Sequence, residues 1–122
     1  MWIYEQSSGK FHNPVGSVIC IGYSGHGVGL DNPADQDIPD VGPIPQGDWE
    51  IGPFFDDPGG KGPIVAHLTP LPGTDTAGRS GFMIHGDNSA MNHTASEGCL
   101  ILPHPIRAQI AASLDRVLRV TA

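Results

Sequence analysis

The chain has 122 residues, about the size of one domain, and 39% of them are hydrophobic while 16% are charged. These proportions exclude a disordered chain and a coiled coil. The formal net charge is −7, with only six Lys and Arg residues, which argues against a nucleic-acid partner because phosphate binding needs a basic face. We expect no membrane span and no ordinary secretory signal, since no stretch is long and apolar enough and the first residues lack a basic segment followed by an apolar one.

Glycine and proline punctuate the chain without a repeat, with 17 and 12 residues respectively. This predicts a single mainly-β domain over residues 1–122, built from short strands and tight turns. In chain order, strands are expected within residues 1–6, 15–23, 41–52, 64–68, 81–85 and 99–102. In the third of these, Trp49 and Ile51 alternate with Asp48 and Glu50, the period of a half-buried strand. Residues 27–43, 56–63 and 70–80 are expected to be loops or turns.

The C-terminal segment is predicted to be an amphipathic helix. Pro105 suits the first helical position, because the N–H that it lacks would be unpaired there. Apolar residues then follow at helical spacing: Ile106, Ile110, Leu114, Val117 and Leu118. Arg116 and Arg119 would lie in the last turn, where positive charge suits the helix dipole. We expect this helix to pack on the sheet without a chemical role.

The two cysteines have different surroundings. Cys20 lies in the apolar run Ser-Val-Ile-Cys-Ile-Gly, where a cysteine behaves as a small buried hydrophobe. Cys99 follows a glycine at the start of an apolar strand, and fourteen residues earlier His85 ends another short strand. The loop between them is small and polar, so its ends can meet at modest entropic cost. A paired imidazole could take the thiol proton and return it to a leaving amine.

The residue before this cysteine is expected to matter for transition-state stabilisation. Gly98 lets a substrate carbonyl approach the backbone and can adopt a sharp turn. The N–H groups of Gly98 and Cys99 could then form an oxyanion hole. Metal binding is the competing hypothesis, because four residues offer ligands that zinc favours: His85, His93, Cys99 and His104. Their spacings match no common zinc pattern. Among the other histidines, His26 in a glycine-rich loop is the best candidate for a pocket wall.

Two segments of the chain resemble YkuD-type L,D-transpeptidases. Residues 84–88 (Ile-His-Gly-Asp-Asn) followed by residues 95–100 (Ala-Ser-Glu-Gly-Cys-Leu) match that family's histidine, polar loop and Ser-x-Gly-Cys. Residues 42–51 match its earlier strand motif, a Pro-x-Gly turn followed by an aromatic and a β-branched residue. The resemblance implies a YkuD-type β-sandwich or barrel, here with the C-terminal helix, and it implies neither a cofactor nor a metal.

A closer resemblance, to type VI secretion L,D-transpeptidase effectors, runs through most of the chain. It is carried by residues 2–9, 22–27, 32–33, 41–45 and 78–82. These effectors are antibacterial toxins of Gram-negative bacteria. The resemblance implies passage through the type VI secretion machinery into the periplasm of a target cell, and a cognate immunity protein in the producer. It would also explain an envelope enzyme without a signal peptide.

Carried over residue by residue, the resemblance makes Cys99 the nucleophile and His85 the base. The Gly86 carbonyl would orient the imidazole, and Ser96 would shape the turn. Where the wider family often has His before Gly-Cys, this chain has Glu97, and it has Leu100-Ile101-Leu102 where the family often has Arg. Arg79 is therefore the expected substitute for the contact with the substrate carboxylate. The other candidate substrate-binding residues lie in the matching motifs: Tyr23, His26, Asp87, Asn88 and Glu97.

The implied substrate is the tetrapeptide stem of peptidoglycan. Cys99 would attack the amide after the third residue and release D-Ala, leaving a thioester. Water, a D-amino acid or a neighbouring stem amine could accept the acyl group, and the sequence does not choose among them. Two other readings stay open: a peptidoglycan cysteine endopeptidase or amidase, and a non-catalytic wall-binding domain. Papain-like wall hydrolases place their cysteine before the histidine, the reverse of the order here.

Overall fold

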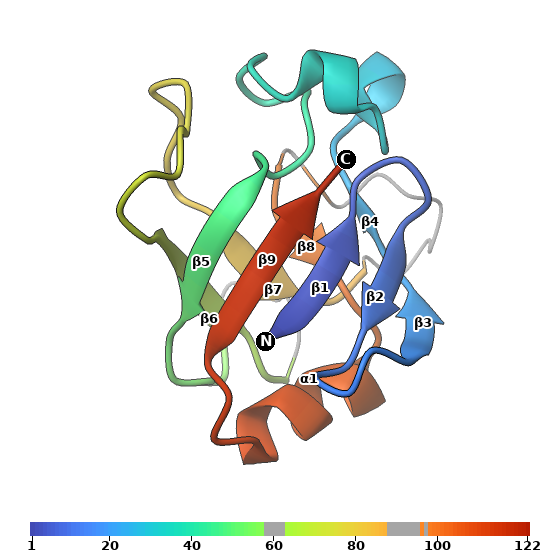
Figure 1. The fold of residues 1–122 in the computed structure, drawn as a ribbon, viewed down its shortest axis with the longest axis vertical. Helices are drawn as coiled ribbons and strands as arrows, with labels where there is room; N and C mark the ends of the chain where they lie inside the picture. The colour runs from blue at the N-terminus through green and yellow to red at the C-terminus, as the bar shows by residue number, and fades with distance from the viewer. Residues whose placement is uncertain (58–62, 88–95, 97) are drawn as a thin grey trace.

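A computed structural model describes residues 1–57, 63–87, 96 and 98–122, and Figure 1 shows them as a strongly curved sheet with a helix at one end. The strands are β1 (Trp2–Glu5), β2 (Lys10–His12), β3 (Val18–Ile21), β4 (Tyr23–Ser24), β5 (Gly47–Ile51), β6 (Ala66–Pro70), β7 (Met83–His85), β8 (Leu100–Ile101) and β9 (Val117–Thr121). Two 3₁₀ turns, η1 (Gly27–Gly29) and η2 (Pro33–Asp35), and the helix α1 (His104–Ala112) complete the fold. In this described part of the chain, no helix is long and apolar enough to cross a bilayer.

The sheet is nearly closed into a barrel. Its strand order is β3-β2-β1-β9-β5-β6-β7-β8-β4, so β3 and β4 are its two edges although only Gly22 separates them in the chain. The Gly22 N–H donates to the Gly9 carbonyl oxygen at 2.8 Å, and a Cβ on Gly22 would lie 2.5 Å from the Ile101 carbonyl oxygen. A residue without a side chain thus lets the two edges approach each other. The prediction of a mainly-β fold is confirmed.

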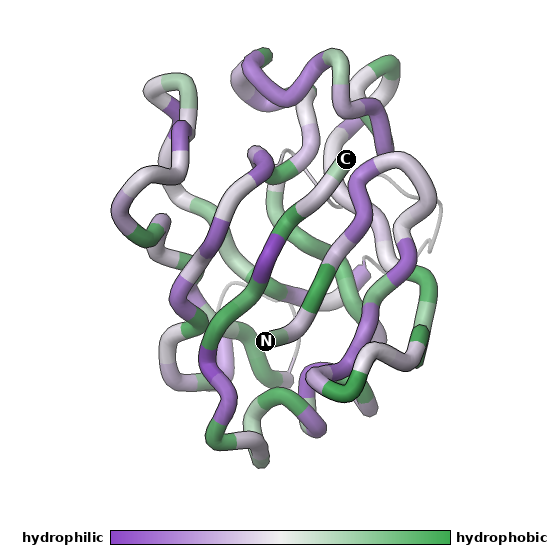
Figure 2. The backbone as a smooth tube through the Cα atoms, in the orientation of Figure 1, coloured by the Kyte–Doolittle hydropathy of each residue, from purple (hydrophilic) through white to green (hydrophobic). Residues whose placement is uncertain are grey.

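The core fills the inside of this barrel. Trp49 and Ile51 are buried while Glu50 is exposed, as the alternation along β5 predicts. Tyr4 and Leu118 are fully buried in the same cluster. Figure 2 shows the alternation of hydrophobic and hydrophilic residues along the front strands. Burial of these aromatic and aliphatic side chains is the main source of stability of such a domain.

The C-terminal helix is shorter than predicted. It ends at Ala112, and the expected continuation of its apolar stripe is wrong: Leu114 is fully exposed, and Val117 belongs to the strand β9. The Ser113 hydroxyl accepts the Asp115 N–H at 3.0 Å, and the Asp115 carboxylate accepts the Val117 N–H at 3.2 Å. Such local side-chain bonds favour a turn over a further helical turn.

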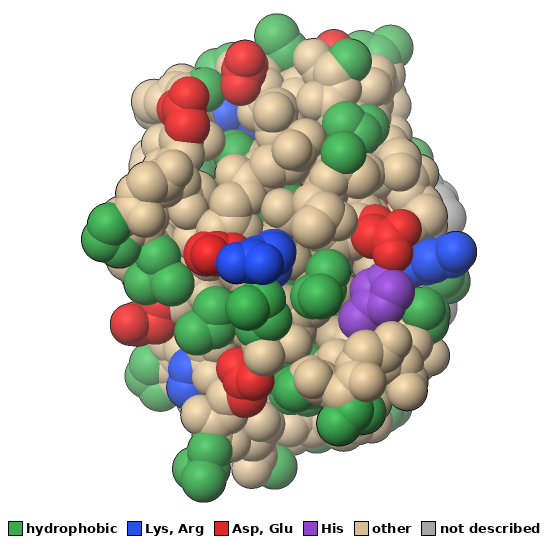
Figure 3. All heavy atoms as spheres, in the orientation of Figure 1, with side chains coloured by type: hydrophobic (Ala, Val, Ile, Leu, Met, Phe, Trp, Pro, Cys, Tyr) green, Lys and Arg blue, Asp and Glu red, His purple; other side chains and the backbone are tan. Residues whose placement is uncertain are grey.

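Strand β9 is central in the sheet because it pairs with β1 on one side and with β5 on the other. The two arginines predicted for the last helical turn therefore lie elsewhere, Arg119 in β9 and Arg116 directly before it. Arg119 pairs with Asp48 on the facing strand at 2.8 Å, and Arg116 donates to the Gly52 carbonyl oxygen at 2.7 Å. Charged side chains of both signs are scattered between hydrophobic ones on this outer face (Figure 3).

Candidate active site

His85 ends β7, and Cys99 comes directly before β8, which pairs with β7 in parallel. Ile84 pairs with Leu100 and His85 pairs with Ile101, and the side chains of Ile84 and Leu100 are fully buried in the core. Because side chains alternate along extended chain, His85 and the cysteine that precedes Leu100 project from the other side of this pair. The topology therefore brings the segments that carry the predicted base and the predicted nucleophile side by side.

The imidazole of His85 is buried and oriented. Its Nδ1 lies 2.8 Å from the Gly86 carbonyl oxygen, and only 3% of the residue is exposed. Because a carbonyl oxygen only accepts hydrogen bonds, this contact requires the proton on Nδ1. Nε2 is then the nitrogen that can accept a proton. The geometry expected between this histidine and the following carbonyl is present.

Arg107 of α1 packs against Gly86, the residue after this histidine, and the sequence did not indicate a role for it at the site. Its Nη1 donates to the Leu102 carbonyl oxygen at 2.6 Å, and the Leu102 N–H donates to the His85 carbonyl oxygen at 3.1 Å. A Cβ on Gly86 would lie 2.6 Å from the same Nη1. Burial lowers the pKa of Arg107, and its Nε has no hydrogen-bond partner in the described structure. No sequence signal marks this arginine, since it lies in an ordinary helical segment.

Ser96 organises the turn that carries Cys99. Its fully buried hydroxyl accepts the N–H groups of Gly25 at 2.9 Å and of Gly98 at 3.0 Å, and donates to the Cys99 carbonyl oxygen at 2.7 Å. This hydroxyl therefore ties the turn to the glycine-rich loop after β4. The contact also corrects the expected oxyanion hole. The Gly98 N–H already donates to the Ser96 hydroxyl, so only the Cys99 N–H remains a predicted oxyanion-hole donor.

Ser24 supports the same turn from the other side. This buried residue of β4 donates its hydroxyl to the Gly98 carbonyl oxygen at 3.1 Å and accepts the Ile44 N–H at 2.8 Å. It lies in the segment 22–27 that carries the family resemblance, yet a lone serine there gives no sign of its partners. Gly98 itself has a φ of +133°, a conformation that side chains rarely adopt.

The predicted substrate-binding residues are only partly brought together. The Tyr23 hydroxyl donates to the Asp87 carboxylate at 2.6 Å, which joins β4 to the residue two positions after the base. His26 is exposed at the start of η1. Asn88 and Glu97 lie outside the described residues, so their contribution stays a prediction.

Arg79 does not fit its expected role as the contact for the substrate carboxylate. The residue is 9% exposed, and its guanidinium donates to three backbone carbonyl oxygens. Nη1 binds those of Gln36 at 2.7 Å and Pro43 at 2.8 Å, and Nη2 binds that of Gly42 at 3.0 Å. These bonds direct the guanidinium into the protein.

The alternative of a metal site gains no support from the described residues. Among them, no group of three or more His, Cys, Asp or Glu side chains could hold a metal ion. His104 begins α1, and His93 lies outside the described residues.

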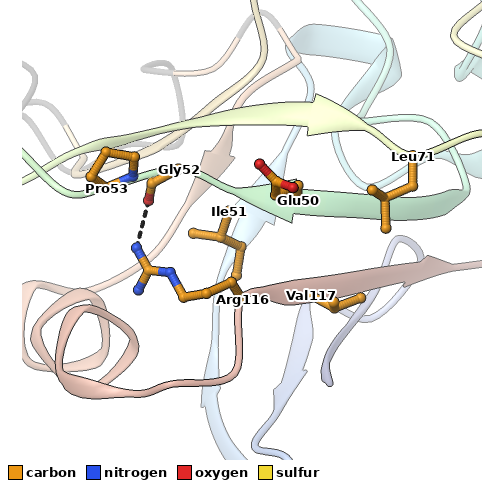
Figure 4. A pocket seen from close by; sticks show the side chains of 7 residues that line it. All are labelled: Glu50, Ile51, Gly52, Pro53, Leu71, Arg116 and Val117. Atoms are coloured by element: carbon orange, nitrogen blue, oxygen red, sulfur yellow. Dashed lines mark hydrogen bonds between the residues drawn. The ribbon is translucent and has the colours of Figure 1, made fainter.

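A separate hollow of about 410 Å³ lies on the outer side of β5 and β9 (Figure 4). It is lined by Glu50, Ile51, Gly52, Pro53, Leu71, Arg116 and Val117. Figure 4 shows the Arg116 guanidinium bound to the Gly52 carbonyl at one end of the hollow. None of the predicted site residues lines it.

The fold and the contacts define a class: a small, nearly closed β domain in which a buried histidine ends one strand and a half-buried cysteine precedes the parallel strand beside it. A family model, described as the Tlde1 domain, matches residues 19–121, and the chain belongs to this family. Membership indicates a type VI secretion effector, which implies a secretion machinery, delivery into target cells and a cognate immunity protein, and is consistent with antibacterial action. No curated protein and no solved structure shows significant similarity to the chain.

Proposed function

We propose that this effector modifies peptidoglycan, with Cys99 as the nucleophile and His85 as the general base. The observation that carries the proposal is the 2.8 Å contact between His85 Nδ1 and the Gly86 carbonyl oxygen. It leaves Nε2 unprotonated in the neutral ring, and a base must be unprotonated to take the thiol proton. The thiolate, not the thiol, is the nucleophilic form of cysteine.

The proposed reaction has two halves. The Cys99 sulfur attacks the carbonyl carbon of the amide after the third residue of a tetrapeptide stem, while His85 holds the thiol proton. The C–N bond then breaks, the imidazolium gives its proton to the departing D-Ala amine, and a thioester to Cys99 remains. In the second half, His85 takes a proton from the acceptor, which attacks the thioester carbonyl. The C–S bond then breaks, and the imidazolium returns the proton to the Cys99 sulfur.

The acceptor decides the product. Water gives an L,D-carboxypeptidase reaction, a D-amino acid gives exchange of the terminal residue, and a stem amine gives a 3–3 crosslink. The first two outcomes would deplete the tetrapeptide donors that wall crosslinking needs, which suits a toxin acting in the periplasm of a rival cell. We assign substrate contacts to Tyr23 and Asp87, whose side chains are joined at 2.6 Å, and to the exposed His26.

Digestion of purified tetrapeptide muropeptides tests this proposal. The wild type is expected to remove or exchange D-Ala, and Cys99→Ala and His85→Ala are each expected to abolish the change. Cys20→Ala is the matched control and should keep full activity. Continued modification by Cys99→Ala would contradict the mechanism. Cleavage of crosslinks without loss of D-Ala would favour an endopeptidase, and binding of muropeptides without any change would favour a wall-binding domain.

A further inference from the structure

Arg79 is a buried cation beside the turn that carries the proposed nucleophile. Its three carbonyl partners all belong to residues 36–43, the segment that includes the end of the loop after η2. Its guanidinium carbon also lies 5.0 Å from the centroid of the Phe82 ring. Contacts on both the polar and the aromatic side fix the position of this positive charge.

The same guanidinium lies directly against the turn that carries Cys99. A Cβ built on Gly98 would lie 2.3 Å from Arg79 Nη2 and 3.2 Å from the Phe82 ring. The backbone of Gly98 therefore packs on the guanidinium at a distance that only glycine allows. Ser96 and Ser24 also hold the turn, through hydrogen bonds to the Gly98 backbone. The turn that presents the thiol is thus supported by two hydroxyls and one buried cation.

We propose that Arg79 is a positioning residue that fixes the Gly98–Cys99 turn and stabilises the thiolate of Cys99. This inference rests on the proposed function in that it takes Cys99 as the nucleophile. A fixed positive charge beside a thiol favours its ionised form, because the ionised form is attracted to the charge and the neutral form is not.

The electrostatics of Arg79 agree with this arrangement. Burial lowers the pKa of Arg79, whereas Asp40, Asp37 and Cys99 oppose that shift by attracting the guanidinium. An electrostatic attraction acts equally on both partners, so the attraction between Arg79 and Cys99 also favours the thiolate. Asp37 and Asp40 are exposed and weaken the field of the arginine at the thiol.

The other titratable groups of the candidate site lie on neighbouring elements. His85 comes from β7, and Asp87 follows it with its carboxylate bound to the Tyr23 hydroxyl of β4. Replacing Arg79 removes a positive charge without altering these groups. A change in thiol ionisation after that replacement therefore reports on the arginine.

The test is the pH dependence of Cys99 alkylation by iodoacetamide, followed by peptide mass spectrometry in the full chain. In Arg79→Met, the midpoint of the Cys99 profile is expected to rise by about one pH unit, so that alkylation at pH 7 slows about tenfold. Arg79→Lys keeps the charge but loses the forked hydrogen bonds, and its midpoint should rise less. Arg119→Gln removes an exposed arginine on β9 and is the matched control, with no expected change.

A variant that leaves the arginine in place covers the case in which Arg79→Met does not fold. Combined Asp37→Asn and Asp40→Asn should lower the midpoint of Cys99 alkylation, most clearly at low salt, because the arginine is then less neutralised. Circular dichroism and the Cys20 alkylation profile report whether each variant is folded.

An unchanged Cys99 midpoint in folded Arg79→Met would overturn the proposal, as would an unchanged or raised midpoint in the double Asn variant. Alkylation requires no peptidoglycan, so this outcome is independent of the digestion of muropeptides. A shifted Cys99 midpoint in Arg79→Met, together with no modification of muropeptides by the wild type, would contradict the proposed function alone. Modification of muropeptides together with an unshifted Cys99 midpoint would contradict the role of Arg79 alone.

Discussion

The two thiols of the chain are held in different surroundings. Cys20 in β3 packs against the core, and burial raises its pKa to about 11. Cys99 is attracted electrostatically to Arg79, and its Sγ lies 3.8 Å from the Gly81 carbonyl oxygen. Both residues are half-buried, so exposure alone does not separate them. Their reactivity should follow charge and hydrogen bonding instead.

We therefore expect iodoacetamide at pH 7 to label Cys99 at least about tenfold faster than Cys20, because only the thiolate reacts. A carbapenem should show the same selectivity. Quantitative mass spectrometry of the two peptides measures both alkylation rates in one sample. A denatured sample serves as the reference, because there the ratio of the two rates no longer depends on the folded structure. Equal rates in the folded protein would contradict an activated Cys99.

The contact between Gly86 and Arg107 provides a second test at this scale. In Gly86→Ala, the new methyl group must displace the Arg107 guanidinium, whose Nη1 would be 2.6 Å away. We expect a loss of about 1–3 kcal/mol in the free energy of unfolding, the usual cost of overpacking. Gly52→Ala is a milder control, since its Cβ would lie 3.3 Å from the nearest atom, the His67 carbonyl oxygen. Urea unfolding that gives equal stabilities for both variants would contradict this packing.

At the scale of elements, the sequence was informative where its periodicity was unambiguous. Alternation in residues 48–51 predicted β5 and its buried side, and the apolar segment ending at His85 predicted β7. The prediction that the helix continues after Ala112 is wrong because Leu114, Val117 and Leu118 fit helical spacing by chance. Their structure is set instead by the pairing of β9 with β1 on one side and with β5 on the other. Such non-local pairing is not visible in a local sequence pattern.

A pair of leucine variants distinguishes these two interpretations. The helical stripe would bury both Leu114 and Leu118, whereas in the structure Leu118 is fully buried and Leu114 is fully exposed. Leu118→Ala should lower the free energy of unfolding by about 2–5 kcal/mol. Leu114→Ala should change it by less than about 0.5 kcal/mol. Similar losses in both variants, measured by chemical denaturation, would contradict the assignment of β9.

The sequence predicts the candidate reacting residues of the site but not the residues that support them. His85, Gly86, Ser96 and Cys99 lie in motifs that the sequence displays. Ser24, Arg107 and the buried position of Arg79 depend on segments that meet only when the sheet closes. The expected oxyanion donor at Gly98 failed for the same reason: a hydroxyl two residues away takes its N–H, and spacing alone does not show which way that group points.

At the scale of the whole molecule, carboxylates on the outer face link neighbouring strands. Glu5 of β1 contacts His12 of β2 at 2.5 Å, and Asp48 of β5 contacts Arg119 of β9 at 2.8 Å. Hydrogen bonds to His12 and Ser8 lower the pKa of Glu5, and hydrogen bonds to Arg119 lower the pKa of Asp48.

These lowered pKa values predict how stability changes with acid. A carboxyl with a lowered pKa in the folded state takes up its proton first in the unfolded chain, so its contribution is present above about pH 4 and is lost as the pH falls through its folded pKa. Melting temperatures measured between pH 7 and pH 2 should therefore fall at the acid end. Combined Glu5→Gln and Asp48→Asn should make that fall shallower. An equally steep fall in the variant would show that these two carboxyls do not contribute.

The central claim is that Cys99 carries the acyl group of a peptidoglycan stem as a thioester. Intact-protein mass spectrometry after brief mixing with tetrapeptide stems and an acid quench tests it directly. We expect a mass increase equal to the mass of the tetrapeptide stem minus that of free D-Ala. The adduct should be located on Cys99, absent in Cys99→Ala and kept in Cys20→Ala. Release of D-Ala without any adduct on Cys99, or an adduct that persists in Cys99→Ala, would show that Cys99 does not carry the acyl group.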